Sequence, residues 1–236
     1  MSAIYKRELR AYYHSMIGWV FTAAMLILVG IYFMAYNMYQ GYVYFSYALA
    51  SACNMLMLLV PVLTMRSMSE ERASRTDQLL LTSPVSLTGV VLGKYFAAVA
   101  VMLLTTLLTM LFVGVIALYG AVYPGEMLVG YLGFILQGCA FIALDLCVSG
   151  YAGNQVTAVV LAFGVNFALW MLDILATAVQ LPWLSGVMSF LSLYTRQEPF
   201  LMGQLSFASI GFDVTFVIAC LLLTIHALDA RRYRGG

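Results

Sequence analysis

The amino-acid sequence predicts an all-α membrane protein with six transmembrane helices, and three observations support this fold class. Hydrophobic residues make up 64% of the 236 residues and charged residues 9%, whereas soluble domains are roughly 45–50% apolar and about 25% charged. Apolar runs of about 20 residues, the length that crosses a bilayer as a helix, recur along the chain. Basic residues gather in alternate connections between these runs. We expect a single transmembrane domain over residues 1–236.

The predicted spans are separated by short connections that contain turn-forming or charged residues. The first run follows a basic, aromatic start, is too long for the core of a signal peptide and has no small-residue cleavage site, so we expect it to stay in the mature protein. The six spans cover residues 17–36, 45–65, 96–119, 127–148, 156–176 and 210–228.

The basic residues predict the orientation of the chain. Six spans put both termini on one side, and the positive-inside rule places the side richer in Lys and Arg in the cytoplasm. The opposite side holds only Arg196. Both termini are therefore predicted to be cytoplasmic. The residues on the basic side are Lys6, Arg7 and Arg10, then Arg66, Arg72, Arg75 and Lys94, then Arg231, Arg232 and Arg234.

Residues 1–15 predict a helix that lies along the membrane interface. Tyr5, Leu9, Tyr12, Tyr13 and Met16 fall at helical spacing on one face, and basic side chains follow another. Lys6, Arg7 and Arg10 are interpreted as interfacial anchors, and so is Lys94, whose apolar stem is expected to lie along the third span. A plain positive anchor for the first span is an alternative interpretation that is compatible with the helix.

The largest predicted inner loop, residues 66–92, favours a short charged helix in the cytoplasm. Ser67 and Glu70 have the spacing of a capping box, and Glu71 and Arg75 form a favourable i, i+4 pair. Pro84 ends the helix after a cluster of three leucines. A solvated connecting loop is the alternative.

Residues 177–209 form the longest predicted outer segment and also have two faces. Apolar and polar positions alternate at helical spacing, so we expect an amphipathic segment at the outer interface. It either covers the mouth of a pathway or packs on the helix ends. The apolar face holds Trp183, Leu184, Val187, Met188 and Leu191, and the polar face Ser185, Ser189 and Ser192.

No motif in the sequence supports catalysis by this chain. Residues 89–95 imitate a phosphate-binding loop but have one residue too few between the glycines, and Tyr95 stands where a Mg²⁺-binding Ser or Thr belongs. Ser149 and His226 lack a nucleophile elbow. Two histidines at opposite ends of the chain and four scattered cysteines predict no metal site. The net charge of +1 forms no basic stripe for nucleic acid.

Polar residues inside the predicted spans are few. Gln137 and Asn166 are the deepest, and such amides commonly bond a neighbouring helix. They are candidate residues of a transport pathway, because polar groups at membrane depth often have functions.

The inner loop resembles that of the ABC-2 family of transporter permeases, in which a Glu-Glu-basic helix leads into a leucine pair, Pro-Val and Gly-Lys-Tyr. The resemblance extends to residues 6–10, 17–20 and 154–156, and so to nearly the whole chain, and the branch it most resembles is the gliding-motility type. Two departures are Arg75 with Asp77 in place of a Gly-Thr-x-Glu run, and Met16 in place of a proline. The matching inner-loop residues are Glu70, Glu71, Arg72, Leu79, Leu80, Leu81, Pro84, Val85, Gly93, Lys94 and Tyr95.

The resemblance implies a non-catalytic permease subunit of an ATP-binding cassette exporter in the bacterial cytoplasmic membrane. ATP and Mg²⁺ would bind to a separate ATPase present in two copies, and this chain would bind no cofactor. A second permease copy or a related chain would complete the pathway. The residues implied in ATPase coupling are Glu70, Glu71, Arg72, Arg75, Thr76, Leu80 and Pro84.

Two other functions are the alternatives. A membrane-embedded substrate-binding component of an uptake system also has about six spans, but it needs no charged inner helix of this kind. An intramembrane enzyme would need convergent polar groups within the spans, and the sequence offers no credible set.

Overall fold

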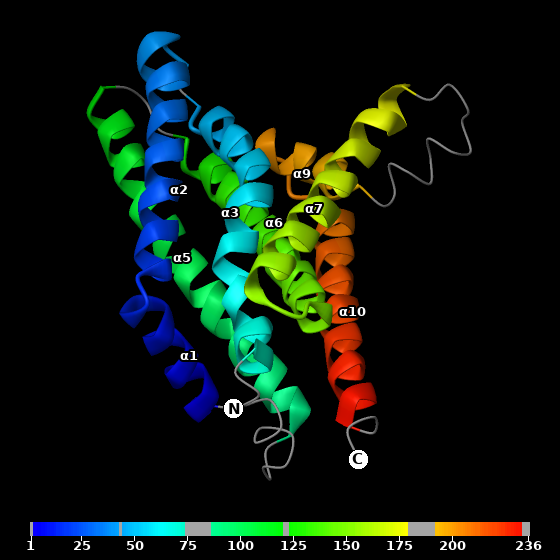
Figure 1. Ribbon diagram of the computed structural model, residues 1–236. Coiled ribbons are helices and arrows are strands. Elements are labelled where there is room, and N and C mark those ends of the chain that lie inside the picture. The colour runs from blue at the N-terminus through cyan, green and yellow to red at the C-terminus, as the bar shows by residue number, and fades with distance from the viewer. Residues whose placement is uncertain (1, 43, 74–85, 120–122, 179–191, 233–236) are drawn as a thin grey trace.

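The computed structural model describes residues 2–42, 44–73, 86–119, 123–178 and 192–232 (Figure 1). These residues form helices joined by short connections, and the described part of the chain contains no strand. The elements are α1 (Ser2–His14), α2 (Ile17–Phe33), the π-helical segment η1 (Met34–Tyr39), α3 (Ser46–Ala73), α5 (Leu87–Tyr119), α6 (Pro124–Tyr151), α7 (Gln155–Ala178), α9 (Leu193–Leu201) and α10 (Phe207–Arg232).

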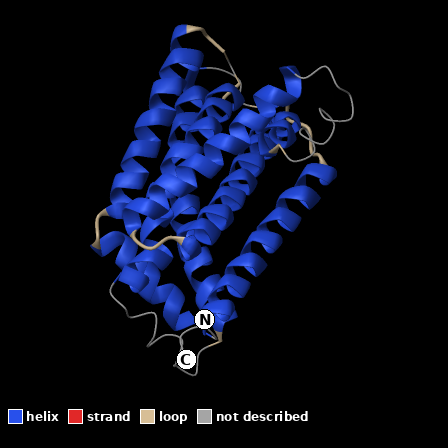
Figure 2. Ribbon diagram, turned by 45° about the vertical axis from the view of Figure 1, so that its right-hand side comes forward, coloured by secondary structure: helices blue, strands red, loops and turns tan. Residues whose placement is uncertain are grey.

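Six helices are long and apolar enough to cross a membrane, which confirms the predicted fold class within the described residues. The third span begins earlier than predicted, at Leu87 instead of residue 96, because Gly93 and Lys94 continue the helix. The spans run side by side, with the start of α1 and the end of α10 at one end of the bundle (Figures 1 and 2). We call this end the termini end. The spans are Ile17–Tyr39, Ser46–Ser69, Leu87–Leu118, Pro124–Tyr151, Gln155–Ala176 and Phe207–Ala230.

Helix α6 forms the centre of the bundle. It packs against α3, α5, α7, α9 and α10, and 61% of the residues in its most apolar stretch are buried. By contrast, only 17% of those in α7 and 28% of those in α10 are buried. Helices α7 and α10 therefore leave broad apolar faces for contact with lipid or with another membrane protein.

Helix α1 packs against α5 at the termini end. The two helices approach closely at Gly93, which has no side chain: a Cβ atom at this position would lie 2.9 Å from Cγ2 of Ile4. Tyr12 is buried, but Met16 lies beyond the helix end and is 71% exposed. Met16 has a left-handed backbone, with φ of 62°, which turns the chain sharply into α2. The prediction that Met16 shares the apolar face of α1 is therefore wrong.

The second span continues without a break into the charged sequence that follows it. The capping box predicted at Ser67 is absent, because α3 runs from Ser46 to Ala73 and Ser67 lies in its interior. Residues such as Met, Glu, Arg and Ala favour a helix, and no glycine or proline stops it there. The charged segment thus begins as a direct continuation of α3.

Candidate functional site

The termini end of the bundle contains a buried ion pair that joins three helices. Lys94 of α5 is 1% exposed, and its ammonium group lies 3.2 Å from Oε1 of Glu8 on α1. The same group donates a hydrogen bond to the backbone carbonyl of Ser67 on α3. A buried ammonium group is tolerated only when it is paired in this way. Lys94 therefore pairs inside the bundle instead of extending to its surface, and its role as an interfacial anchor stays a prediction.

Glu8 is the residue that sequence reasoning missed. It is the one acidic residue in α1, among several basic residues, and this isolation is a signal that could have identified it. Its side chain is only 13% exposed and also accepts a hydrogen bond from Arg7 at 2.6 Å. Glu8 therefore connects an exposed arginine to the buried Lys94.

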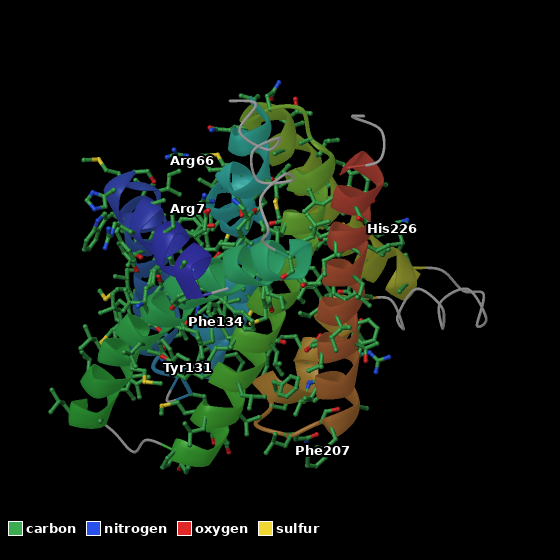
Figure 3. The ribbon with its side chains drawn as sticks, turned by 90° about the horizontal axis from the view of Figure 1, so that it is seen from below. Arg7, Arg66, Tyr131, Phe134, Phe207 and His226 are labelled. Atoms are coloured by element: carbon green, nitrogen blue, oxygen red, sulfur yellow. The ribbon has the colours of Figure 1, made fainter. Side chains whose placement is uncertain are left out.

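The basic residues of α1 lie where the sequence predicted them, on the exposed face of the helix. Lys6, Arg7 and Arg10 are exposed, and Figure 3 shows Arg7 and Arg66 on the same side of the termini end. Their role as interfacial anchors stays a prediction. Next to them, a small cavity of about 40 Å³ is lined by Glu8, Tyr12, Arg66 and Ser67, among others. Burial raises the pKa of Tyr12, and the nearby Glu8 carboxylate raises it further, so the phenol stays neutral.

The predicted coupling residues begin on the turn of α3 that follows Ser67. Glu70, Glu71 and Arg72 are among the last residues of this helix. The structure describes their backbone and not their side chains. Arg75, Thr76, Leu80 and Pro84 lie in residues 74–85, outside the described part of the chain. Their coupling role stays a prediction. The structure adds that the segment departs from the helix whose Ser67 carbonyl binds Lys94.

Asn166, a predicted pathway residue, connects three helices. Its amide nitrogen donates to Oδ1 of Asp145 on α6 at 3.0 Å and to the carbonyl oxygen of Met57 on α3 at 3.4 Å. Pro61 lies four residues after Met57 and has no N–H to donate to that carbonyl. Asn166 thus supplies the hydrogen bond that Pro61 cannot, as expected at membrane depth, where unsatisfied carbonyls are costly.

Gln137, the other predicted pathway residue, is 1% exposed on α6. Neither atom of its side-chain amide has a hydrogen-bond partner among the described residues. Gln137 and Asn166 are therefore both enclosed by the helices of this chain, and their role in a pathway stays a prediction.

The geometry around Ser149 gives no support to an intramembrane serine hydrolase. Ser149 is buried, and its hydroxyl has no hydrogen-bond partner among the described residues. A nucleophilic serine needs a base within hydrogen-bond reach. His226 is exposed on α10, on the opposite side of the termini end from Arg7 (Figure 3).

At the other end of the bundle, α9 is attached to the end of α7. Oδ1 of Asp173 accepts hydrogen bonds from the hydroxyls of Ser192 at 2.9 Å and Thr195 at 2.6 Å. Ser192 also caps α9 by accepting a hydrogen bond from the backbone N–H of Thr195. Most of the predicted outer amphipathic face lies in residues 179–191, outside the described residues. Ser192, predicted on the polar face, is fully buried.

These observations define a multi-pass helical membrane protein whose second span continues as a charged helix beside a buried three-helix junction. The chain belongs to the ABC-2 family: the family described as ABC-2 family transporter protein matches residues 2–229. A comparison with curated proteins found no match. The chain is therefore a membrane component of a transporter family, as the resemblance of the inner loop implied.

Proposed function

We propose that this chain is the permease subunit of an ATP-binding cassette exporter and takes its energy from a separate ATPase. The family match over residues 2–229 carries the proposal. It is supported by the charged extension of α3 at the termini end, where the positive-inside rule places the cytoplasm. In this proposal the protein lies in a bacterial cytoplasmic membrane.

The energy of ATP is proposed to enter through the charged segment that begins at Glu70. Two ATPase copies hold ATP and Mg²⁺, and their closure moves this segment. Because α3 is continuous from Ser46 to Ala73, a movement of its charged end displaces the whole span. Lys94 binds the Ser67 carbonyl and Glu8, so α1 and α5 would move with α3 as one rigid body.

A second permease copy, identical or related, is proposed to complete the pathway. The broad apolar faces of α7 and α10, which are 17% and 28% buried over their most apolar stretches, offer surfaces for such a contact. This chain would then form one half of the path and bind no nucleotide itself.

A charge reversal in the coupling segment tests the proposal. We expect Glu71→Lys to weaken association with the ATPase or to uncouple hydrolysis from transport, because losing one member of a desolvated pair costs on the order of 2–5 kcal/mol. The matched control is Asp229→Lys at the end of α10, which should leave the ATPase contact unchanged.

The measurements are co-purification of the ATPase and its hydrolysis rate in the reconstituted complex. Normal insertion, full ATPase retention and unchanged coupled hydrolysis would remove Glu71 from the contact. If neutralising the whole segment from Glu70 to Arg75 also has no effect, the permease proposal gives way to a substrate-binding component of an uptake system.

A further inference from the structure

A cleft of about 450 Å³ opens at the end of the bundle opposite the termini end. It lies between the start of α3, the start of α6 and the end of α9, three segments far apart in sequence. Its walls include Tyr44, Ser46, Tyr47, Glu126, Glu198 and Met202. The cleft therefore combines aromatic, apolar and acidic groups in a volume typical of small-molecule sites.

The two carboxylates of the cleft are not neutralised within the described residues. Glu126 and Glu198 are exposed, and the side chain of neither has an ion-pair or hydrogen-bond partner in that part of the chain. Arg196, the one basic residue that the sequence assigns to this end, is used elsewhere: its guanidinium carbon lies 4.9 Å from the ring centre of Phe212 on α10. The cleft thus has a negative potential that favours a cation.

The tyrosine rings beside these carboxylates are held in place by other aromatic rings. The ring of Tyr47 lies 5.0 Å from that of Tyr42, and the ring of Tyr44 lies 5.5 Å from that of Tyr123. Tyr47 is nevertheless 50% exposed and Tyr44 41% exposed. Supported rings with open surface can bind a cation at little cost in side-chain entropy.

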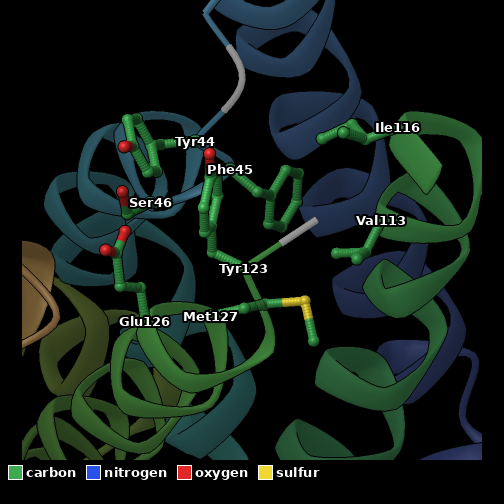
Figure 4. Close-up of a pocket in the computed structure, with 8 residues that line it drawn as sticks. All are labelled: Tyr44, Phe45, Ser46, Val113, Ile116, Tyr123, Glu126 and Met127. Carbon is green, nitrogen blue, oxygen red and sulfur yellow. The ribbon is translucent and has the colours of Figure 1, made fainter. Parts of the chain in front are cut away.

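The position of Glu126 is fixed by the turn that follows α9. Gly203 has φ of +71°, and a Cβ atom on it would lie 2.7 Å from Cγ of Glu126. A glycine is therefore required for this turn to pack on the stem of Glu126. In Figure 4 the Glu126 carboxylate points toward Ser46, with Tyr44 on the far side of that serine.

We propose that this cleft binds an organic cation, an ammonium group with apolar substituents, between the tyrosine rings and the two carboxylates. A hard metal ion fits less well, since Ca²⁺ takes six to eight oxygen ligands and Leu201 and Met202 line the same cleft. The cation is either a free amine or the headgroup of a lipid. The site requires neither ATP nor an ATPase, so it can be tested independently of the proposed function.

The test uses the purified full chain in nanodiscs of phosphatidylglycerol, with choline as the probe. Its uncharged isostere, 3,3-dimethyl-1-butanol, has the same shape with carbon in place of nitrogen. Titration by saturation-transfer NMR should show saturable choline binding that is at least about 10-fold tighter than that of the isostere. The expected preference corresponds to about 1.4 kcal/mol.

Variants assign the binding to the cleft. The double variant Glu126→Gln/Glu198→Gln should weaken choline binding at least about 10-fold, and Tyr47→Leu about 2- to 30-fold, as expected for one cation–π contact. The matched control is Tyr39→Leu, a tyrosine of the same end that is 92% exposed and lies outside the lining of the cleft. If the double variant does not fold, the test uses the single change Glu198→Gln, because the Glu198 side chain is exposed on α9.

A second set of nanodiscs containing phosphatidylcholine identifies the source of the cation. If the phosphatidylcholine headgroup occupies the cleft, choline binding that depends on Glu126 and Glu198 should be lost in these discs, and the site is assigned to a lipid headgroup. Unchanged choline binding assigns the site to a free amine. Equal affinity for choline and its isostere, absence of saturable choline binding, or full binding by the double variant would overturn the proposal.

Discussion

The ammonium group of Lys94 lies 3.2 Å from Oε1 of Glu8, although 86 positions separate the two residues. This ion pair joins α1 to the third span, and the Ser67 carbonyl joins both to α3. The segment proposed to contact the ATPase begins three residues after Ser67. The junction therefore lies where a movement of that segment would enter the bundle.

Replacing Lys94 by Met should destabilise the protein by about 3 kcal/mol. This value is at the low end of the range for breaking a buried ion pair, because Glu8 keeps Arg7 as a partner. The double variant Lys94→Met/Glu8→Met should recover part of this loss, since no unpaired carboxylate is left behind. Thermal unfolding in detergent measures both. Additive losses in the double variant would mean that the two side chains do not interact.

The hydrogen bond between Asn166 and the Met57 carbonyl predicts that the stability lost on replacing Asn166 depends on the residue at position 61. Asn166→Leu should destabilise the wild-type background by at least about 1–3 kcal/mol, because it leaves the buried Met57 carbonyl and Oδ1 of Asp145 unpaired. In a Pro61→Ala background the loss should be smaller by about 0.6 kcal/mol, since an alanine at this position can donate its own backbone N–H to the Met57 carbonyl. A double-mutant cycle measures the difference. Equal losses in the two backgrounds would contradict the role of Asn166 as a substitute donor.

The hydrogen bonds that Asp173 accepts from Ser192 and Thr195 are expected to stabilise α9 against the end of α7. Asp173→Ala removes the acceptor of Ser192 and Thr195, and hydrogen bonds to a charged group contribute about 1.5–3 kcal/mol. Amide hydrogen exchange should therefore accelerate within Leu193–Leu201 while α6 stays protected. Asp229→Ala on α10 is the control and should leave the exchange of α9 unchanged. The same acceleration in both variants would indicate general loosening.

The basic-residue asymmetry predicts the topology. Accessibility tags at residue 1, at residue 74 and at residue 236 should report the cytoplasm, and tags beside Glu126 and Glu198 should report the outside. Protection of the Glu198 tag in cells whose outer face is accessible would reverse the assignment. The cleft beside Glu198 would then open to the cytoplasm.

The sequence predicted the spans well because hydrophobicity alone sets their existence and approximate length. It failed where the position of a polar side chain is determined by a partner that is distant in the chain. Lys94 has the pattern of an anchor, and only folding brings Glu8 and Ser67 to it. Likewise, the sequence identifies Asn166 as a polar residue at membrane depth, but its hydrogen bond to the Met57 carbonyl depends on how α3 and α7 pack. The sequence also misplaces the start of the charged helix, since nothing local stops α3 at Ser67.

The composition of the native complex tests the central claim most directly. The chain should be purified with its endogenous partners from the membranes of its own host, and subunits and bound small molecules counted by native mass spectrometry. The account predicts two ABC ATPase copies together with two permease chains, of which at least one is this chain. A single copy without an ATPase, carrying a bound small molecule, would contradict it and favour a substrate-binding component of an uptake system.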